Sequence, residues 1–218
     1  LKALEARSDL VKLEALEALI KLKDPASTDR LIRLVENESS APLLVRKAVI
    51  ALGELKSQQA LPALAKALVM ERNGISFFGE ASFAMFQVGA PAIEALLAII
   101  DGSDKVFLRW AEERNRSAAG YLSKAAIILA DLGDPRAIPG LLKLMKWEDA
   151  DGNDVYTMLV HGTAAEALGR LRAKQGAAPI SAKIAIEEAN IREKFALALA
   201  WIGDASVLPK MEAATKKG

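Results

Sequence analysis

The apolar positions of the chain follow a helical spacing that repeats six times. Each stripe has four apolar residues at i, i+3, i+4 and i+7, and the stripes begin at Ala15, Ala48, Ala81, Ala125, Ala164 and Phe195. This spacing places four side chains on one face of an amphipathic helix. Subtracting neighbouring starting positions gives periods of 33, 33, 44, 39 and 31 residues. Self-similarity at such a period is typical of a repeat array.

A turn and a second apolar stripe follow each first stripe. The turn signals are clearest at Lys23-Asp24-Pro25 and Gly133-Asp134-Pro135. A glycine ends a helix in the left-handed conformation, and Asp followed by Pro begins the next helix. The second stripes include Leu31, Leu64, Leu96 and Leu141. We therefore expect twelve helices in six antiparallel pairs, with no sheet and with room for a short extra helix within residues 104–114.

The excess length of the longer repeats lies at one kind of junction. Residues 72–78, 102–116 and 147–157 each separate the second helix of one repeat from the first helix of the next. Insertions at equivalent junctions project from the same edge of a repeat array, which is often its binding edge. These junctions hold six of the eleven aromatic residues, and aromatic side chains dominate interface hot spots. The residues predicted to contact a partner are Phe77, Phe78, Phe107, Arg109, Trp110, Arg114, Arg116, Trp147 and Tyr156. The alternative is that the rings pack onto their own repeats and fasten long loops.

A row of basic residues is the second candidate surface. Alignment of the second stripes brings four cations to one equivalent position: Arg33, Lys66, Lys143 and Lys183. Three of them lie two residues past a buried leucine, a rotation of about 200° that directs them away from the core. Such a concave row would suit an acidic groove, a phosphate or an anionic lipid. The alternative is an ordinary solvated helix face.

Composition narrows the classes of function. Hydrophobic residues make up 52% of the chain and aromatic residues only 5%, which predicts a core of Ala, Leu, Ile and Val. The 29 basic and 28 acidic residues leave a formal net charge of +1. A nucleic-acid-binding domain usually has a strong basic excess, so this balance argues against that class of partner. No apolar run reaches the roughly 18 residues of a membrane span. The chain begins at Leu1 without a signal-like segment, which indicates that a start codon, leader or preceding domain has been removed.

Catalytic and metal-binding motifs are missing from the sequence. The chain has no cysteine and a single histidine, His161, which excludes thiolate and multi-histidine metal centres. Residues 149–154 alternate oxygen-bearing side chains as a calcium loop does. However, Asp154 stands where that loop needs glycine, and Val160 where it needs glutamate. No nucleophile elbow, P-loop or dinucleotide fingerprint is present. We therefore predict no catalytic residue, no metal and no cofactor.

The turn after the fourth stripe carries a family resemblance. The segment Leu132-Gly133-Asp134-Pro135-Arg136-Ala137-Ile138-Pro139 resembles a HEAT-like repeat of the phycobilisome-lyase type. Ala51-Leu52-Gly53 and Ala167-Leu168-Gly169 match it more loosely. The resemblance implies an all-α fold, a right-handed α-α superhelix (solenoid) of about six HEAT-like helical-hairpin repeats, as one domain over residues 1–218 that is part of a longer precursor or chain. The paired His-Glu motifs of the iron-dependent hydroxylases that share this repeat are absent.

Three functions are compatible with this reading. The first is a non-enzymatic scaffold or adaptor that binds another protein through the inter-repeat loop edge and the concave face. The second is a phycobilin-lyase-like enzyme, which the resemblance suggests but for which the chain shows no convergent acids. The third is a nucleic-acid-binding HEAT-like protein that would use Arg109, Arg114 and Arg116, with Trp110 stacked on a base. We expect the first, because the repeats, the balanced charge and the lack of catalytic motifs all favour it.

Overall fold

The computed structural model describes residues 2–185 and 188–215, and these are almost entirely helical. The described residues form thirteen α-helices, of which twelve make six hairpins. The first helices of the hairpins are α1 (Asp9–Leu22), α3 (Pro42–Glu54), α5 (Phe78–Val88), α8 (Ala118–Leu132), α10 (Asp154–Arg170) and α12 (Ala189–Ile202). The second helices are α2 (Thr28–Glu36), α4 (Leu61–Val69), α6 (Ala90–Asp101), α9 (Ile138–Leu144), α11 (Ala177–Lys183) and α13 (Leu208–Thr215). The thirteenth helix, α7 (Lys105–Glu113), is inserted between α6 and α8.

The turns inside the hairpins are built as the sequence predicts, with one additional feature. Lys23 and Gly133 end α1 and α8 in the left-handed conformation, with φ values of 50° and 70°. The side chain of Asp134 then accepts a hydrogen bond from the Arg136 backbone N–H (2.8 Å). A short 3-10 turn stands between this cap and the second helix in five hairpins, as η2 (Pro25–Ser27), η3 (Gln58–Ala60), η4 (Pro135–Ala137), η5 (Lys174–Gly176) and η6 (Ala205–Val207). One more 3-10 turn, η1 (Lys2–Glu5), precedes α1.

The prediction that the chain contains no sheet is wrong at one place. Strands β1 (Glu71–Arg72) and β2 (Ile75–Ser76) pair antiparallel, with Arg72 opposite Ile75. The two linking residues, Asn73 and Gly74, have φ values of 53° and 74°. An Asn-Gly pair readily adopts two successive positive φ angles, and such a turn has the twist that two strands need. The insertion after α4 is therefore a small hairpin.

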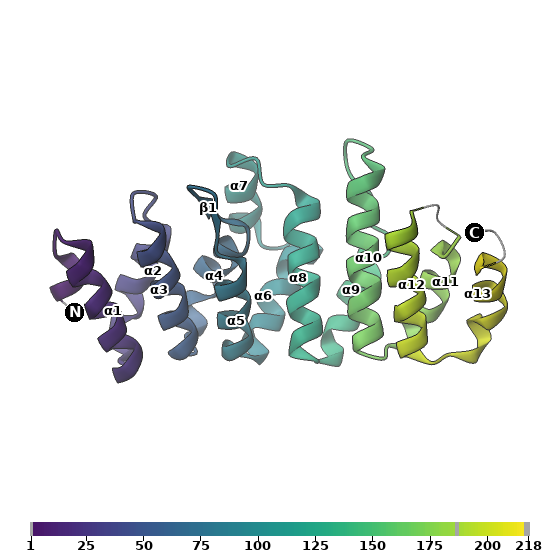
Figure 1. The fold of residues 1–218 in the computed structure, drawn as a ribbon, viewed down its shortest axis with the longest axis horizontal. Helices are drawn as coiled ribbons and strands as arrows, with labels where there is room; N and C mark the ends of the chain where they lie inside the picture. The colour runs from purple at the N-terminus through teal and green to yellow at the C-terminus, as the bar shows by residue number, and fades with distance from the viewer. Residues whose placement is uncertain (1, 186–187, 216–218) are drawn as a thin grey trace. The chain divides into compact units, whose positions relative to one another are not determined.

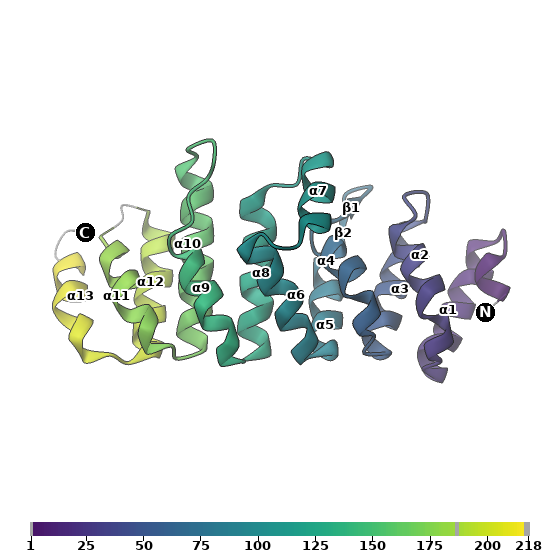
Figure 2. The same cartoon turned by 180° about the vertical axis from the view of Figure 1, so that it is seen from behind.

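The chain divides into two compact units, which are described separately. The first contains α1 to α5, the start of α6 up to Ala95, and the segment Asp104–Asn115. The second contains Leu96–Ser103 and the chain from Arg116 onward. Within each unit the first helices form one layer and the second helices form the other, as the front and back views show (Figures 1 and 2).

Leucines of the repeat stripes fill the space between the two layers. Leu52 and Leu64 are fully buried in the first unit, as are Leu129 and Leu141 in the second. Neighbouring first helices approach closely where a glycine faces an alanine. A Cβ on Gly53 would lie 2.7 Å from Ala84 Cα, and a Cβ on Gly169 would lie 2.7 Å from Ala198 Cα. These approaches join successive repeats, so each unit is a stack of helical hairpins, as the sequence predicts, and the first unit carries the β1–β2 hairpin in addition.

Candidate functional site: the inter-repeat loop edge

The loop edge of the first unit consists of the α2–α3 loop, the β1–β2 hairpin and α7. Each of these segments follows a second helix, and they gather at one edge of the unit in both ribbon views (Figures 1 and 2). Helix α7 packs against α4. Two of the three predicted insertions, residues 72–78 and 102–116, therefore lie with the α2–α3 loop at one edge of this unit.

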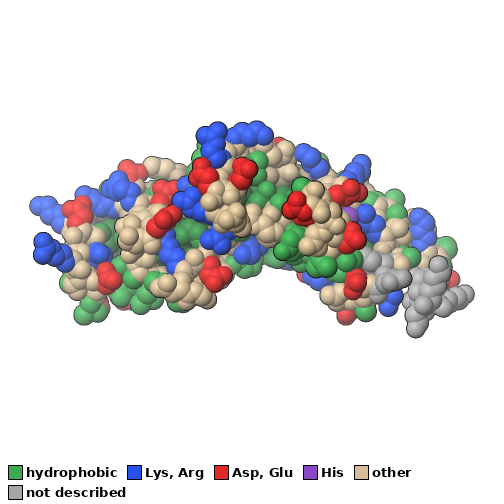
Figure 3. Space-filling view, turned by 90° about the horizontal axis from the view of Figure 1, so that it is seen from above, with side chains coloured by type: hydrophobic (Ala, Val, Ile, Leu, Met, Phe, Trp, Pro, Cys, Tyr) green, Lys and Arg blue, Asp and Glu red, His purple; other side chains and the backbone are tan. Residues whose placement is uncertain are grey.

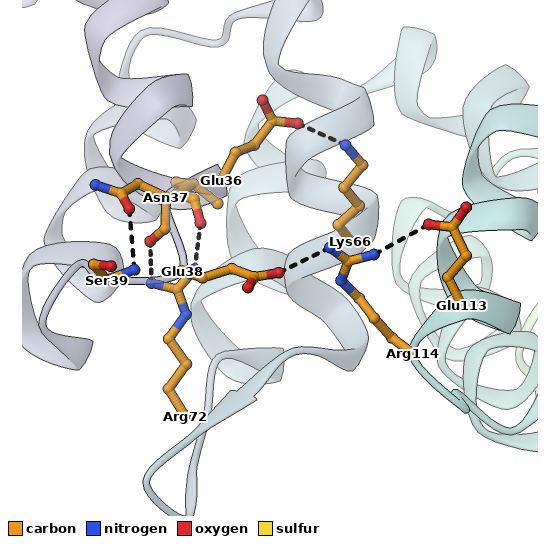
Figure 4. Close-up of polar contacts among 9 residues, drawn as sticks. Glu36, Asn37, Glu38, Ser39, Lys66, Arg72, Glu113 and Arg114 are labelled. Atoms are coloured by element: carbon orange, nitrogen blue, oxygen red, sulfur yellow. Dashed lines mark hydrogen bonds and ion pairs between the residues drawn. The ribbon is translucent and has the colours of Figure 1, made fainter.

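Arg72 connects the hairpin to the α2–α3 loop. Its guanidinium donates hydrogen bonds to the backbone carbonyls of Val35 (2.8 Å), Asn37 (2.7 Å) and Ser40 (3.1 Å). Figure 4 shows this side chain reaching from the hairpin to the loop. Carbonyls at the end of a helix have no partner within it, so the arginine satisfies the Val35 carbonyl at the end of α2 and holds two carbonyls of the following loop. Burial lowers the pKa of Arg72, and the nearby charge of Glu38 partly opposes this shift. A guanidinium nevertheless stays protonated.

Arg114 connects α7 to the same loop. Its guanidinium lies 2.8 Å from a carboxylate oxygen of Glu38 and 3.5 Å from one of Glu113 (Figure 4). It also lies 5.4 Å from the centre of the Trp110 ring, within the range of a cation–π contact. The Trp110 ring in turn contacts Phe107, with 5.9 Å between the ring centres. Arg114 is therefore engaged within the unit, where the sequence predicted a partner-binding residue.

The predicted aromatic residues of the first unit have unequal exposure. Phe77 and Phe107 are buried, at 0% and 3% exposure, and belong to the core. The prediction that Phe77 and Phe107 contact a partner is wrong, because both rings are buried in the core and a partner cannot reach them. Phe78 and Trp110 are half-buried, and Arg109 is exposed. The most exposed apolar side chain of α7 is Val106, at 73%. The sequence pattern does not single out Val106, because its side chain is neither aromatic nor charged.

Of the predicted residues of the second unit, Arg116 precedes α8, Trp147 lies in the loop before α10 and Tyr156 lies in the first turn of α10. Arg116 and Trp147 are half-buried, and Tyr156 is 43% exposed. Nε2 of His161 donates a hydrogen bond to the Trp147 carbonyl (2.8 Å), since only a protonated nitrogen can pair with that oxygen. Burial, and then the nearby charge of Lys183, lower the pKa of His161. Trp147 is thus held through its backbone, while Tyr156 remains accessible.

The basic row on the second helices is partly neutralised. Arg33 and Lys143 are exposed, as their helical position predicts, and Lys183 is half-buried. Lys66 Nζ lies 2.6 Å from a carboxylate oxygen of Glu36, on the neighbouring second helix. Lys143 Nζ donates to the Asp101 carbonyl (3.4 Å). Ligand binding by this row stays a prediction, and Lys66 already has a partner.

Ion pairs between successive repeats account for many of the exposed charges. Lys47 pairs with Glu17 (2.9 Å) in the first unit, and Arg170 pairs with Asp131 (2.6 Å) in the second. On the face shown in Figure 3, Lys and Arg side chains alternate with Asp and Glu side chains over each unit. Exposed pairs of this kind contribute little to stability individually. Their arrangement leaves no broad surface of one charge on that face.

Features of a catalytic or metal centre are sparse in the described part of the chain. No group of three or more His, Cys, Asp and Glu residues within residues 2–185 and 188–215 is placed to hold a metal ion. A hollow of about 520 Å³ in the second unit is lined by Gly169, Arg170, Arg172, Ala200 and Trp201. Of the two arginines that line this hollow, Arg170 already donates a hydrogen bond to the carboxylate of Asp131 (2.6 Å). No helix among the described residues has the length and apolar content that crossing a bilayer requires.

Stacked helical hairpins with inter-repeat insertions define the class of α-helical repeat proteins. A family model for HEAT repeats matches residues 1–75, and a model for the PBS lyase HEAT-like repeat matches residues 122–146. Residues 1–75 and 122–146 are therefore identified as HEAT-like repeats, which confirms the resemblance drawn from the turns of the chain. A search of curated proteins finds no match. Among solved structures, human deoxyhypusine hydroxylase in complex with glycerol is similar at 18% identity and a TM-score of 0.44, over 92% of this chain and 82% of that chain.

Proposed function

We propose that this protein is a non-enzymatic scaffold that binds a partner protein through its inter-repeat loop edge. The observation that carries the proposal is that apolar side chains are exposed on α7 and on the start of α10, which are additions to the helical hairpins. Val106 on α7 is 73% exposed, and Val155 at the start of α10 is 66% exposed. Contiguous exposed apolar patches mark interaction surfaces, and Val155 lies beside the exposed side chains of Tyr156 and Leu159.

The way these segments are fastened supports the proposal. Helix α7 is held through buried Phe107 and the ion pair between Arg114 and Glu38. A segment that is ordered before binding loses less conformational entropy when a partner arrives. The Arg109 and Val106 side chains therefore stand on a fixed support, which favours specific contacts over non-specific ones.

Site-specific photo-crosslinking tests the proposal. A photoreactive amino acid would replace an edge position in either unit (Val106 on α7 or Val155 at the start of α10), Arg33 or Lys143 on the second helices, and Ala26 or Ala205 in the 3-10 turns at the other end of the hairpins. The protein is exposed to an extract of its source organism, and crosslinked products are identified by mass spectrometry. We expect one partner to be crosslinked from the edge positions and not from the turns. Crosslinks from Arg33 and Lys143 alone would indicate that the partner binds the basic row on the second helices, which would contradict the proposal.

Substitutions measure the energetic share of the two surfaces once the partner is in hand. Trp110→Ala and Trp147→Ala should each weaken binding by about 2 kcal/mol if these rings act as hot spots. The double variant Lys66→Glu/Lys143→Glu tests the concave face and should bind normally. Circular dichroism of each variant is needed, because Trp110 contacts Phe107 and Arg114 within the unit. Normal binding by both tryptophan variants, with loss in the lysine variant, would overturn the assignment to the edge.

A further inference from the structure

The first turns of α10 differ from the rest of the second unit. Helix α10, at 17 residues, begins beyond the ends of its neighbours, and its start projects past α8 and α12 in the ribbon view (Figure 1). The Asn153 side chain caps this start by accepting hydrogen bonds from the backbone N–H groups of Val155 (3.0 Å) and Tyr156 (3.3 Å). The projecting turns are therefore regular helix up to their first residue.

One face of these turns is covered by the preceding loop. The Thr157 hydroxyl accepts a hydrogen bond from the Asp149 backbone N–H (3.0 Å), and His161 donates to the Trp147 carbonyl (2.8 Å). Thr157 and His161 are four residues apart and share a face of the helix. Val155 and Leu159 are each two residues from Thr157, a rotation of about 200°, so they lie on the opposite face.

That opposite face is apolar and exposed. Val155 is 66% exposed, Leu159 is 42% exposed, and the adjacent Tyr156 is 43% exposed. Val155 and Leu159 are spaced i, i+4 and are neighbours on the helix surface. We call Val155, Tyr156 and Leu159 the α10 tip. A helix face with this spacing offers anchor sites to a partner helix laid across it.

The surroundings of the α10 tip are acidic. Residues 146–154 contain four carboxylates and one lysine, a local charge of −3. The carboxylates are Glu148, Asp149, Asp151 and Asp154, of which all but Asp149 are exposed. None of the four forms an ion pair with Lys or Arg among the described residues. Elsewhere in the unit, by contrast, Asp131 and Glu166 are paired across repeats. Asp149 accepts hydrogen bonds from the backbone N–H groups of Asp151 (3.2 Å) and Asn153 (3.3 Å), so the exposed carboxylates of Glu148, Asp151 and Asp154 are the ones that a cationic partner could meet.

We propose that the α10 tip binds a basic amphipathic helix of a partner protein. This inference rests on the proposed function, and it names the chemistry of the partner at one part of the edge. Apolar side chains of the partner helix would pack on Val155 and Leu159, while its Lys or Arg side chains would face Glu148, Asp151 and Asp154. Nucleic acids and anionic membranes carry the same sign of charge as this surface and are repelled by it.

A peptide titration tests the inference with the full chain. The probe is a fluorescein-labelled peptide of about 18 residues, with Leu at helical i, i+3, i+4 spacing and Lys at the other positions. Fluorescence anisotropy follows its binding, and a peptide with Glu in place of Lys is the control. We expect the Leu/Lys peptide to bind and the Leu/Glu peptide to bind at least about tenfold more weakly at low salt.

Variants assign the binding to the tip. Val155→Ser/Leu159→Ser should lower the affinity for the Leu/Lys peptide by about tenfold, because less apolar area is buried on binding. Glu148→Gln/Asp151→Asn should lower the affinity for the same peptide about fivefold at low salt. At about 0.5 M salt exposed charges are screened, so the effect on affinity should be very small. Val106→Ser on α7 removes an exposed valine elsewhere and should bind like the unchanged protein. Thermal melting confirms that the variants remain folded.

Three results would overturn the inference: no binding of the Leu/Lys peptide, equal binding of the two peptides, or unchanged binding by the Val155→Ser/Leu159→Ser variant. Any of these, together with edge crosslinks to a partner from Val106, would leave the scaffold function intact and remove only the basic-helix assignment. Peptide binding at the tip without edge crosslinks from Val106 or Val155 would support the tip chemistry and count against the wider edge. The two proposals therefore fail separately.

Discussion

Single leucines in the repeat stripes hold the two helical layers of each unit together. Leu52 on α3 is fully buried, whereas Leu43 on the same helix is 49% exposed. Leu52→Asp should lower the free energy of unfolding by about 4 kcal/mol or more, because it places an unpaired charge in an apolar seam. Leu129→Asp should act likewise in the second unit. The matched control Leu43→Asp should cost little. Urea unfolding measures all three, and an unchanged stability for Leu52→Asp would show that the repeat register is wrong.

His161 is a buried residue whose charge state should affect stability. Its pKa is lowered by burial and by Lys183, against smaller opposing effects of the Trp147 carbonyl and Glu148. A histidine with a depressed pKa in the folded state binds fewer protons there than in the unfolded chain. Stability should therefore be complete above the unfolded pKa of about 6.5 and should fall as the pH drops below it.

Unfolding in urea at several pH values between about 7.5 and 5.5 checks this expectation. His161→Gln keeps an N–H donor for the Trp147 carbonyl but cannot titrate. Its stability should vary less over this range than that of the unchanged protein. An identical pH dependence in the two proteins would show that His161 does not contribute.

Helix pairs within each unit depend on close backbone approach. Gly169 on α10 leaves room for Ala198 on α12, since a Cβ at position 169 would lie 2.7 Å from the Ala198 Cα. Gly169→Ala should therefore destabilise the second unit by about 1–3 kcal/mol through overpacking. Gly120→Ala on α8 is the matched control, because its nearest neighbour would be an ordinary 3.8 Å away. That change should be neutral or stabilising, because alanine favours a helix. Equal melting temperatures for the two variants would contradict the close approach.

The hairpin holds its neighbouring loop through one side chain. Arg72 donates to three carbonyls of Val35, Asn37 and Ser40, and a lysine has no planar fork to reproduce them. Arg72→Lys should lower the free energy of local opening of the α2–α3 loop by about 1–3 kcal/mol. Hydrogen exchange at the amides of Ser39 and Ser40 should therefore become faster. Arg170→Lys, which changes an exposed pair with Asp131, should have a small effect. Unchanged exchange in Arg72→Lys would show that the loop is held by other contacts.

At the scale of the whole molecule, charge determines which classes of partner are excluded. The chain has 29 basic and 28 acidic residues, and these alternate over the face shown in Figure 3. We expect only weak binding of duplex DNA, with little dependence on salt, because few phosphates could be neutralised together. Fluorescence anisotropy with a labelled duplex at about 50 and 200 mM salt measures this. A steep loss of affinity between the two salt concentrations would instead favour the nucleic-acid-binding alternative.

The helices, their pairing and most of the turns between them follow from local patterns in the amino-acid sequence. The stripe from Ala125 to Leu132 lies on α8, and Gly133 and Asp134 form the turn that follows it. The Asn73-Gly74 pair is a known hairpin signal, but the prediction of no sheet passed over it, and the β1–β2 hairpin was missed. These features depend on neighbours within a few residues, so a linear pattern contains the information that specifies them.

Which residues of the inserted segments remain accessible depends on the packing of the folded chain. Phe77 is buried and Tyr156 is exposed, although both are aromatic residues of inserted segments. Arg72 and Arg114 are engaged by the α2–α3 loop, and Arg114 finds Glu38 across 76 positions of sequence. These outcomes depend on which surfaces of distant segments meet when the repeats stack. A local pattern specifies which side chains share a face of a helix, but the neighbours that pack against that face determine whether each side chain is buried, paired or free to bind.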